Sequence, residues 1–484
     1  MGSRKPDRPA SCGRPNILLI TDDQHRWDFF GDTGAVSSLR TPNLDRLRAE
    51  GATFSNCYSV CPICMPARFA WCYGLYPSQA RERLMNNAHD WPPPEALRSM
   101  PQALQKAGYH TALIGKLHSH AELYSHDITV DEWQTRNRGF DYVREVSGKS
   151  LAYWYDCRWT HYLKERGLLE RYRGDLARRN AQLGGEERWE PSALEAADSM
   201  DAFIGREAAA WLDGYGGGKP FFLHASLCGP HFPLDPPEEH FRRHRPEDMP
   251  PPPGVDDSGE AARWQRLRAL YCGLIELVDD QVGVIMDVLE RRGWREDTVV
   301  LFCTDHGDMI GDLGRNHKSV WQDPSCRTPL TVAYPGAVAA GRTLDAMVES
   351  VDLPCTLLDI AGCDVSRSLA QTPGRSFWPL ATGARADHRE WAYAECGVGP
   401  RQWRMVVDED WKYVWHASQG EMLFHRTEDP HDARDLLKAP ENRTGRETSP
   451  AAAQTIDLTR TRLIEAMARC VAPNTVPSHT TGEF

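Results

Sequence analysis

The chain has 484 residues, of which 41% are hydrophobic and 26% are charged, a composition typical of a globular protein. Its length allows one large domain with a smaller one, or up to three domains. The formal net charge of −12 argues against a nucleic-acid-binding surface. An anionic ligand would therefore have to be attracted by local positive charge in a cleft.

The fourteen cysteines are scattered, without the dense disulfide framework of small secreted domains. We expect most of them to be free thiols in a reducing compartment. Residues 1–15 lack the apolar core of a secretory signal, and no run of 18 or more apolar residues exists. The sequence therefore predicts a cytoplasmic protein that does not bind a membrane.

Short apolar runs that end in polar residues alternate with helical patterns through the first part of the chain. Such runs are typical of strands buried on both faces of a parallel sheet. The predicted strands are 16–21, 110–115, 221–226, 298–303 and 329–334. Helices are predicted from Thr41, as N-cap, to Gly51, and over 101–108, 260–292 and 352–361. The alternation predicts an α/β domain over residues 1–370, with a large, mostly parallel sheet between helices.

Two segments depart from this alternation. Residues 120–200 have weaker periodicity and an aromatic cluster over 153–162, and we predict an insertion over the mouth of a site. The cluster is equally consistent with simple packing of that insertion. Beyond residue 370, strand-like pieces follow one another without helices until a helical pattern near 451–470. Residues 371–484 are therefore predicted to form a smaller α+β subdomain with an antiparallel sheet.

The stretch 64–68, Cys-Met-Pro-Ala-Arg, combines a thiol, a helix start and a cation. Pro66 suits the first turn of a helix, which places Cys64 where free N–H groups and the helix dipole favour an anion. Arg68 follows one turn later on the same face, so the stretch predicts an anion-handling site. Two other interpretations remain open: an inert buried thiol, or a redox or zinc site, because Cys61 and Cys64 form a C-x-x-C pair.

Metal-ligand side chains follow two of the predicted strands. Asp23 and Gln24 follow the first strand, and Asp305 and His306 follow the fourth. Because open α/β sheets bind ligands at the carboxyl ends of their strands, these residues predict a divalent metal site. An Asp-His pair after a strand is also compatible with a simple loop cap.

The pattern C-x-P-x-R at Cys64 resembles the signature of the type I, formylglycine-dependent sulfatases of the alkaline-phosphatase superfamily. Two positions depart from that signature: Ala67 stands where the family usually has Ser, and Tyr73 where it usually has Thr. Other segments are similar to family motifs in the same order along residues 16–440. These are 16–28 (opening strand), 115–118 (G-K-x-H), 229–233 (P-H-x-P), 304–308 (second metal segment), 316–318 (a lysine) and 411–431 (C-terminal hairpin).

The resemblance implies an alkaline-phosphatase-like fold and a sulfuric ester hydrolase. Its nucleophile would be hydrated formylglycine, formed from Cys64 by a formylglycine-generating enzyme. A divalent metal, calcium by family default with magnesium or manganese as alternatives, would be held by Asp23, Gln24, Asp305, His306 and residue 64. Arg68, Lys116 and Lys318 would balance the sulfate charge, His231 would protonate the leaving alcohol, and His118 would take a proton from the second hydroxyl of the hydrate.

Three functions remain open at this point. The first is hydrolysis of a small-molecule or saccharide sulfate ester, which Lys116 and His118 favour. The second is hydrolysis of phosphonate monoesters or phosphodiesters, favoured by Gln24 and His306, because this set resembles the branch that includes phosphonate monoester hydrolases. The third is a non-catalytic relative that binds anions with an unmodified Cys64, and the retained Arg68, lysines and histidines argue against it.

Overall fold

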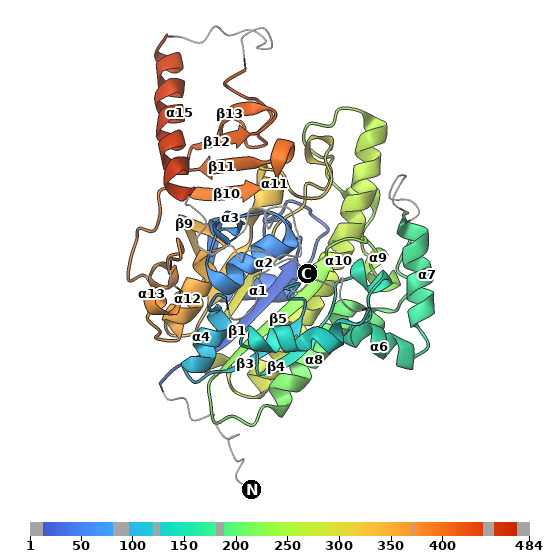
Figure 1. Cartoon of the computed structure of the whole chain (residues 1–484). Coiled ribbons are helices and arrows are strands. Elements are labelled where there is room, and N and C mark those ends of the chain that lie inside the picture. Colours follow the sequence, from blue (N-terminus) through green and yellow to red (C-terminus); the bar gives the residue numbers. More distant parts are fainter. Residues whose placement is uncertain are drawn as a thin grey trace, which may run out of the picture.

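The computed structural model describes residues 13–80, 96–119, 126–180, 188–369, 371–438 and 450–471. A large sheet occupies its centre (Figure 1). The strands are β1 (Asn16–Asp23), β2 (Ala52–Tyr58), β3 (His110–Gly115), β4 (Tyr142–Glu145), β5 (Phe221–Pro230), β6 (Thr298–Thr304), β7 (Arg327–Thr328), β8 (Leu330–Ala333) and β9 (Arg342–Glu349). Their order is β4-β3-β5-β1-β6-β8-β2-β7, with β9 paired to β2.

The half of the sheet from β4 to β6 is entirely parallel, whereas β8 runs antiparallel to both β6 and β2. The predicted fold class, a large and mostly parallel sheet with helices, is therefore confirmed. The central strand β1 lies between β5 and β6. Its carboxyl end consequently meets the carboxyl ends of both neighbours.

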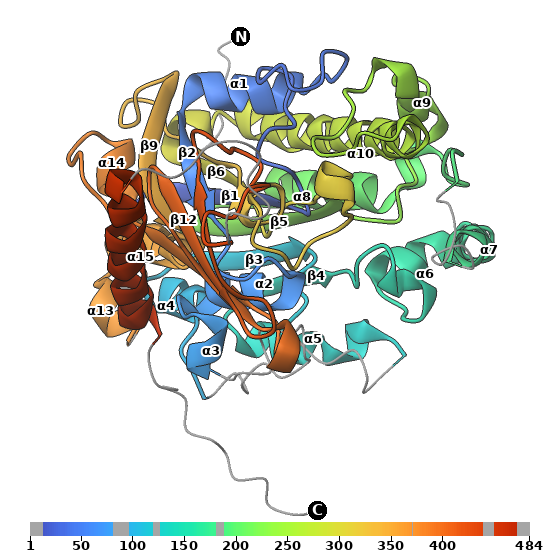
Figure 2. The same ribbon diagram turned by 90° about the horizontal axis from the view of Figure 1, so that it is seen from above.

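Helices cover both faces of this sheet (Figure 2). The helices α2 (Cys64–Tyr73), α4 (Met100–Lys106) and α12 (Asp352–Ile360) lie on one face, and α1 (Pro42–Glu50), α8 (Met200–Gly214) and α10 (Ser258–Arg291) on the other. Shorter or peripheral helices are α3 (Pro77–Ala80), α5 (Glu132–Asn137), α6 (Arg158–Glu165), α7 (Leu169–Asn180), α9 (Glu238–Phe241), α11 (Asp323–Cys326), α13 (Val365–Ser368) and α14 (Trp378–Ala381).

The sequence of β1 is continuously apolar because helices cover both faces of the sheet at this strand. Ile17 and Leu19 pack with the α2 side of the core, and Leu18 and Ile20 pack with the α8 and α10 side. Every residue of β1 is buried. Full burial of each such aliphatic side chain contributes about 1.5–3 kcal/mol. The strand that carries the site is thus anchored from both faces.

The segment that was predicted as an insertion is partly built into the sheet. Its strand β4 pairs in parallel with β3 at the sheet edge. Beyond β4, Trp159 and Tyr172 pack edge to face at 4.7 Å in the core, whereas Trp154 is 66% exposed. The aromatic residues of this segment therefore divide between packing and surface.

A second, antiparallel sheet stands above the large one in Figure 1. It comprises β10 (Ala392–Cys396), β11 (Trp403–Val407), β12 (Trp411–His416) and β13 (Gly420–His425), and α15 (Pro450–Cys470) lies against it. Leu463, Ala466 and Met467 of α15 are buried with side chains of this sheet. The predicted small antiparallel sheet with a helix is confirmed.

Every cysteine within the described residues is a free thiol, as predicted. Among the same residues, no helix combines the length and the apolar character that a bilayer crossing requires. Residues 1–12, on which the prediction about a secretory signal mainly rests, lie outside the described residues.

Candidate active site

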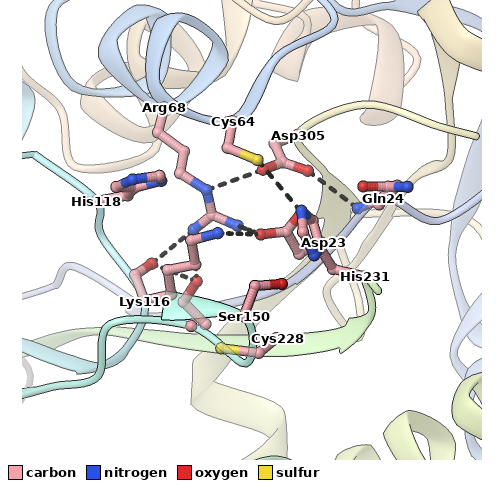
Figure 3. Close-up of polar contacts among 12 residues, drawn as sticks. Asp23, Gln24, Cys64, Arg68, Lys116, His118, Ser150, Cys228, His231 and Asp305 are labelled. Atoms are coloured by element: carbon pink, nitrogen blue, oxygen red, sulfur yellow. Dashed lines mark hydrogen bonds and ion pairs between the residues drawn. The ribbon is translucent and has the colours of Figure 1, made fainter. Parts of the chain in front are cut away.

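The carboxyl ends of β1 and β6 bring two aspartates side by side. Asp22 pairs with Thr304 in the parallel ladder, so Asp23 and Asp305 are the next residues along neighbouring strands. The backbone N–H of Gln24 donates to Asp305 Oδ1 at 3.1 Å. Both aspartates are fully buried (Figure 3). Two buried carboxylates need nearby cations to balance their negative charge. The adjoining helix supplies one of them.

Helix α2 places Cys64 above these carboxylates. Cys64 is the first residue of the helix, after Ile63 in an extended conformation. Pro66 is its third residue, where an N–H would have no partner within the helix. The Cys64 Sγ lies 3.3 Å from His306 Nε2 and 3.7 Å from Asp23 Oδ1. The predicted helix start at Cys64 is confirmed.

Arg68 joins the helix to both strands. Its Nε donates to Asp305 Oδ2 at 2.9 Å, and Nη2 donates to Asp23 Oδ2 at 3.3 Å. Its Nη1 donates to the Lys116 carbonyl at 2.6 Å and to Ser226 Oγ at 2.9 Å. Burial lowers the pKa of this guanidinium, but Asp305 and Asp23 outweigh burial and raise it overall. Arg68 is therefore a fixed cation that orients both carboxylates.

Two lysines approach the same centre from other segments. Lys116, which follows β3, donates from Nζ to Asp23 Oδ2 at 2.8 Å. Lys318 Nζ donates to Cys64 Sγ at 3.1 Å and to Gln24 Oε1 at 2.8 Å. It also lies 2.9 Å from His231 Nε2. Because an ammonium group can only donate, His231 Nε2 must be the acceptor in this contact.

The other ring nitrogen of His231 also has a hydrogen-bond partner. Its Nδ1 lies 2.7 Å from the carbonyl of Phe232 and donates its proton there. The Nε2 of His231 therefore faces Lys318. A proton on the Lys318 ammonium can pass along this hydrogen bond to His231.

His118 lies on the other side of Cys64 and Arg68 (Figure 3). It adopts a positive φ of 61° in the loop after β3. Burial and the charge of Lys116 lower the pKa of His118 to about 4, although a hydrogen bond with Cys64 acts in the opposite direction. At neutral pH the imidazole is therefore uncharged and able to accept a proton.

The charges around Cys64 favour an anion at that position. Burial alone would raise the pKa of the thiol, but Lys116, Lys318 and His306 together bring it well below its usual range. Burial and Cys64 raise the pKa of Asp23, yet the charges of Lys116 and Arg68 help to leave it lowered overall. Negative charge at residue 64 is stabilised by its surroundings.

A cavity of about 260 Å³ opens onto this centre. Its inner wall is formed by Cys64, Lys116, His118, His231 and Lys318. Its outer wall is formed by residues 147–151, Cys228 and Phe232. The loop after β4, within the predicted insertion, thus forms part of the wall of the cavity.

The donor atoms around Cys64 fit a divalent metal. One ligand atom each from Asp23, Cys64, Asp305 and His306 lies within 4.8 Å of the others. Gln24 lies next to these four residues, and its Oε1 accepts a hydrogen bond from Lys318. Carboxylate and amide oxygens with one imidazole suit Ca²⁺, Mg²⁺ or Mn²⁺.

The structure brings all the predicted site residues into one cluster. Sequence reasoning did not identify Ser226, which binds Arg68, or Asp308, which binds Gln24. The cavity wall at 147–151 lies within the segment 120–200 that was predicted to cover the site mouth, although its residues were not named. Asp308 lies inside the T-D-H-G-D motif, so its position could have identified it as a site residue. Ser226 ends a predicted strand as an ordinary polar residue, without a distinguishing pattern.

Two family models together match residues 15–450 of the chain. The family model described as Sulfatase matches residues 15–363. A second model, described as N-sulphoglucosamine sulphohydrolase, C-terminal, matches residues 311–450. The first match covers well over half of the chain and contains every residue of the site.

Curated relatives extend over nearly the full length. An arylsulfatase of Clostridium perfringens is 28% identical over 461 residues, covering 88% of this chain and 91% of the relative. A choline-sulfatase of Rhizobium meliloti is 28% identical over 464 residues, with 89% and 84% covered.

Solved structures share the fold. The phosphonate monoester hydrolase of Agrobacterium radiobacter superposes with a TM-score of 0.76 at 23% identity, covering 95% of this chain and 96% of that one. The corresponding hydrolase of Silicibacter pomeroyi gives 0.75 at 24% identity, with 96% and 97% covered. With the matched family and the full-length relatives, the chain belongs to the sulfatase family of the alkaline-phosphatase superfamily and is a sulfatase.

Proposed function

We propose that this sulfatase hydrolyses a sulfate monoester of a small molecule or saccharide, with formylglycine derived from Cys64 as its nucleophile. The observation that carries this proposal is the position of Cys64. It begins α2 with metal-type ligands on one side and Lys116 and Lys318 on the other. A formylglycine-generating enzyme is the maturation partner that this proposal requires.

The inner wall of the cavity would bind the sulfate group. Lys116 and Lys318 direct their ammonium groups toward the space around residue 64, and Arg68 lies directly behind it. Fixed cations in a buried site stabilise the charge that develops on the sulfate oxygens during transfer. Because Arg68 holds Asp23 and Asp305 in place, it would also preserve the geometry of the ligand set.

Asp23, Gln24, Asp305, His306 and residue 64 would hold the metal. When bound, the metal supplies Lewis-acid polarisation of the sulfate and of the nucleophilic hydroxyl. The outer oxygens Asp23 Oδ2 and Asp305 Oδ2 are already committed to Lys116 and Arg68. Asp23 Oδ1 lies 3.7 Å from Cys64 Sγ, and Asp305 Oδ1 lies 3.6 Å from His306 Nε2 while accepting from the N–H groups of Gln24 and His306.

Two histidines divide the proton transfers in this proposal. His231, which receives a proton from Lys318, would protonate the leaving alcohol at the cavity wall. His118, which is neutral because of its lowered pKa, would take the proton from the second hydroxyl of the formylglycine hydrate and so release sulfate. Serine at position 64 lacks that second hydroxyl and would stop after one transfer.

The second candidate is hydrolysis of phosphonate monoesters or phosphodiesters at the same centre. Gln24 and His306 favour it, because the Asp/Gln/Asp/His set resembles the branch of the family that includes phosphonate monoester hydrolases. The likeness in fold to a phosphonate monoester hydrolase supports the same interpretation. Lys116 and His118 fit the sulfatase cycle, which needs a base to regenerate the aldehyde.

Paired assays distinguish the two candidates. Protein whose peptide mass shows formylglycine at position 64 is given a nitrophenyl sulfate and a nitrophenyl phenylphosphonate at matched concentrations. We expect the larger kcat/KM on the sulfate, and no turnover of either ester by Cys64→Ala. A larger kcat/KM on the phosphonate would replace the first candidate by the second. Full activity with only an unmodified thiol at position 64 would refute the formylglycine cycle.

A further inference from the structure

Before Cys64 is converted to formylglycine, the chain has a thiol at position 64. Its set of metal-donor atoms then differs from that of the converted chain. Cys64 Sγ, His306 Nε2, Asp23 Oδ1 and Asp305 Oδ1 surround one point, one atom from each residue. One sulfur, one imidazole nitrogen and two carboxylate oxygens form a ligand set that zinc accepts. Hard cations such as Ca²⁺ take oxygen ligands and gain little from a sulfur donor.

The spacing of these atoms matches tetrahedral coordination. Zinc bonds of about 2.0–2.3 Å at tetrahedral angles separate neighbouring donors by about 3.3–3.6 Å. The Sγ lies 3.3 Å from His306 Nε2 and 3.7 Å from Asp23 Oδ1. His306 Nε2 lies 3.8 Å from Asp23 Oδ1 and 3.6 Å from Asp305 Oδ1. These four separations lie close to the tetrahedral range, and the four ligand atoms all lie within 4.8 Å of one another.

The outer contacts already orient each donor inward. His306 Nδ1 donates to the carbonyl of Gly307 at 3.0 Å, which leaves the lone pair of Nε2 facing Cys64. Arg68 holds Asp305 Oδ2 and Lys116 holds Asp23 Oδ2, while the N–H groups of Gln24 and His306 orient Asp305 Oδ1. Such outer-shell partners fix ligand orientation in protein zinc sites. The fifth neighbour, Gln24 Oε1, accepts from Lys318 and stays outside the set.

We propose that the unconverted chain binds Zn²⁺ in a tetrahedral site formed by Cys64, His306, Asp23 and Asp305. Zinc would coordinate the thiolate form of Cys64. This inference concerns the cysteine form alone, and it can fail or hold independently of the proposed sulfatase cycle.

Cobalt is the probe for the test, because tetrahedral Co²⁺–thiolate sites absorb strongly in the visible and give a sulfur-to-metal charge-transfer band in the near ultraviolet. The full chain is produced without a formylglycine-generating enzyme, and peptide mass confirms the thiol at position 64. After removal of bound metal, Co²⁺ is titrated and then displaced with Zn²⁺. We expect both absorptions to saturate at one Co²⁺ per chain and to disappear with one equivalent of Zn²⁺.

Two variants make the result specific. Cys64→Ser should lose the charge-transfer band and weaken zinc binding by more than the about 10–100-fold that loss of an outer-shell partner costs. Cys228→Ser removes another buried thiol from the same cavity and should keep both absorptions. In the parent, Zn²⁺ should also slow alkylation of Cys64 by iodoacetamide, as measured by peptide mass.

Three results would overturn the proposal. One is a weak, six-coordinate cobalt spectrum without a charge-transfer band. Another is equal zinc affinity in the parent and in Cys64→Ser. The third is a rate of Cys64 alkylation that zinc does not change.

Discussion

His231 and Lys318 form a connected pair whose role depends on the leaving group. The Nε2 of His231 accepts a hydrogen bond from the Lys318 ammonium at the cavity wall. General acid catalysis contributes about 10²–10⁴-fold, and most of it is needed when the leaving alcohol is a poor one. We therefore expect His231→Ala to lose far more kcat/KM on an alkyl or sugar sulfate than on a nitrophenyl sulfate.

Lys318 offers the comparison for this prediction. If the two residues act as one relay, the double variant with both alanines should lose little more on the alkyl sulfate than Lys318→Ala alone. Equal losses on both substrates for His231→Ala would mean that His231 only contacts the sulfate oxygens. The quantity to report is the ratio of the two losses in kcat/KM.

Asp308 determines which end of the Gln24 amide faces the ligand group. The Gln24 Nε2 donates to Asp308 Oδ2, and Oε1 accepts from Lys318. A carboxylate can only accept and an ammonium can only donate, so the orientation of the amide is fixed by chemistry. Asp308 also accepts from the backbone N–H of Ile310 at 2.8 Å, which anchors it.

Replacing Asp308 should therefore act on the metal rather than on folding. Asp308→Asn can present its own amide N–H₂ to Gln24 and allow the Gln24 amide to turn. We expect affinity for the catalytic metal, measured by equilibrium dialysis, to fall by about 10–100-fold, with the melting temperature little changed.

A charge-conserving exchange checks that explanation. In the double variant Gln24→Asp with Asp308→Asn, a symmetric carboxylate at position 24 no longer needs to be oriented, and the new amide at position 308 can donate to it. Metal affinity should recover relative to Asp308→Asn alone. A double variant as weak as the single one would show that the charge of Asp308, and not its control of Gln24, sets the affinity.

Among the elements, those predicted correctly share one property. The strands β1, β3, β5 and β6 are buried on both faces, so their sequences are continuously apolar and end abruptly in polar residues. This pattern can be recognised in the strand's own sequence, without knowing which strands pair with it. It located both the sheet and the edge where the site lies.

The elements that were missed lack that signal for physical reasons. In β9 the first residues alternate between half-buried and exposed positions, and charged side chains are spread through it. The strand β2 has a mixed pattern because it pairs with antiparallel strands and with β9 away from the centre. Short β4 belongs to a segment whose pairing with β3 depends on distant contacts. These strands are defined by their partners.

The loop that carries Lys318 depends on the second sheet. Trp403 of β11 donates from Nε1 to the carbonyl of Ser319 at 2.9 Å, and the Ser319 N–H donates to the Pro62 carbonyl at 3.1 Å. His317 and Ser319 both have positive φ, at 64° and 74°. A loop with two such residues needs outside contacts to stay in one conformation.

We therefore expect Trp403→Phe to reduce activity through the position of Lys318. Loss of the hydrogen bond leaves a carbonyl unpaired at a cost of about 1–3 kcal/mol. If about 1.4 kcal/mol of that is lost in the transition state, kcat/KM falls about tenfold. Trp415→Phe on β12, which packs toward α15, is the matched control and should retain activity. Equal losses in the two variants would refute the link to Lys318.

Across the whole molecule, the two sheets are joined by buried charges as well as by apolar contacts. Lys412 of β12 donates to Asp323 Oδ1 of α11 at 2.6 Å and also to Asp432. Arg426 donates to Tyr58 Oη of β2 at 2.9 Å. The small sheet is thereby fixed to α11, which follows the Lys318 loop, and to β2 of the large sheet. The division of the chain near residue 370 remains a prediction, since the two sheets share these contacts.

One lysine serves two carboxyl groups in this junction, and that creates a pH dependence. Burial, followed by repulsion from Asp323, raises the pKa of Asp432 from its usual 3.8 to about 7, against the attraction of Lys412. Since the folded state holds this proton more tightly than the unfolded chain does, the contribution to stability is complete below about pH 4. It is lost as the pH rises through about 7, where the buried carboxyl ionises.

Asp432→Asn keeps a neutral group at this position at every pH. We expect its melting temperature to match that of the parent near pH 4 and to exceed it at pH 8, because only the parent must then bury the second negative charge beside Asp323. The exposed Glu428→Gln, on the same segment, is the matched control and should follow the parent across the range. Scanning calorimetry of the three proteins from pH 4 to pH 8 gives the difference directly. A parent that is more stable than Asp432→Asn at pH 8 would mean that Lys412 holds both carboxylates ionised with a net gain, and that the junction is strengthened by the second charge.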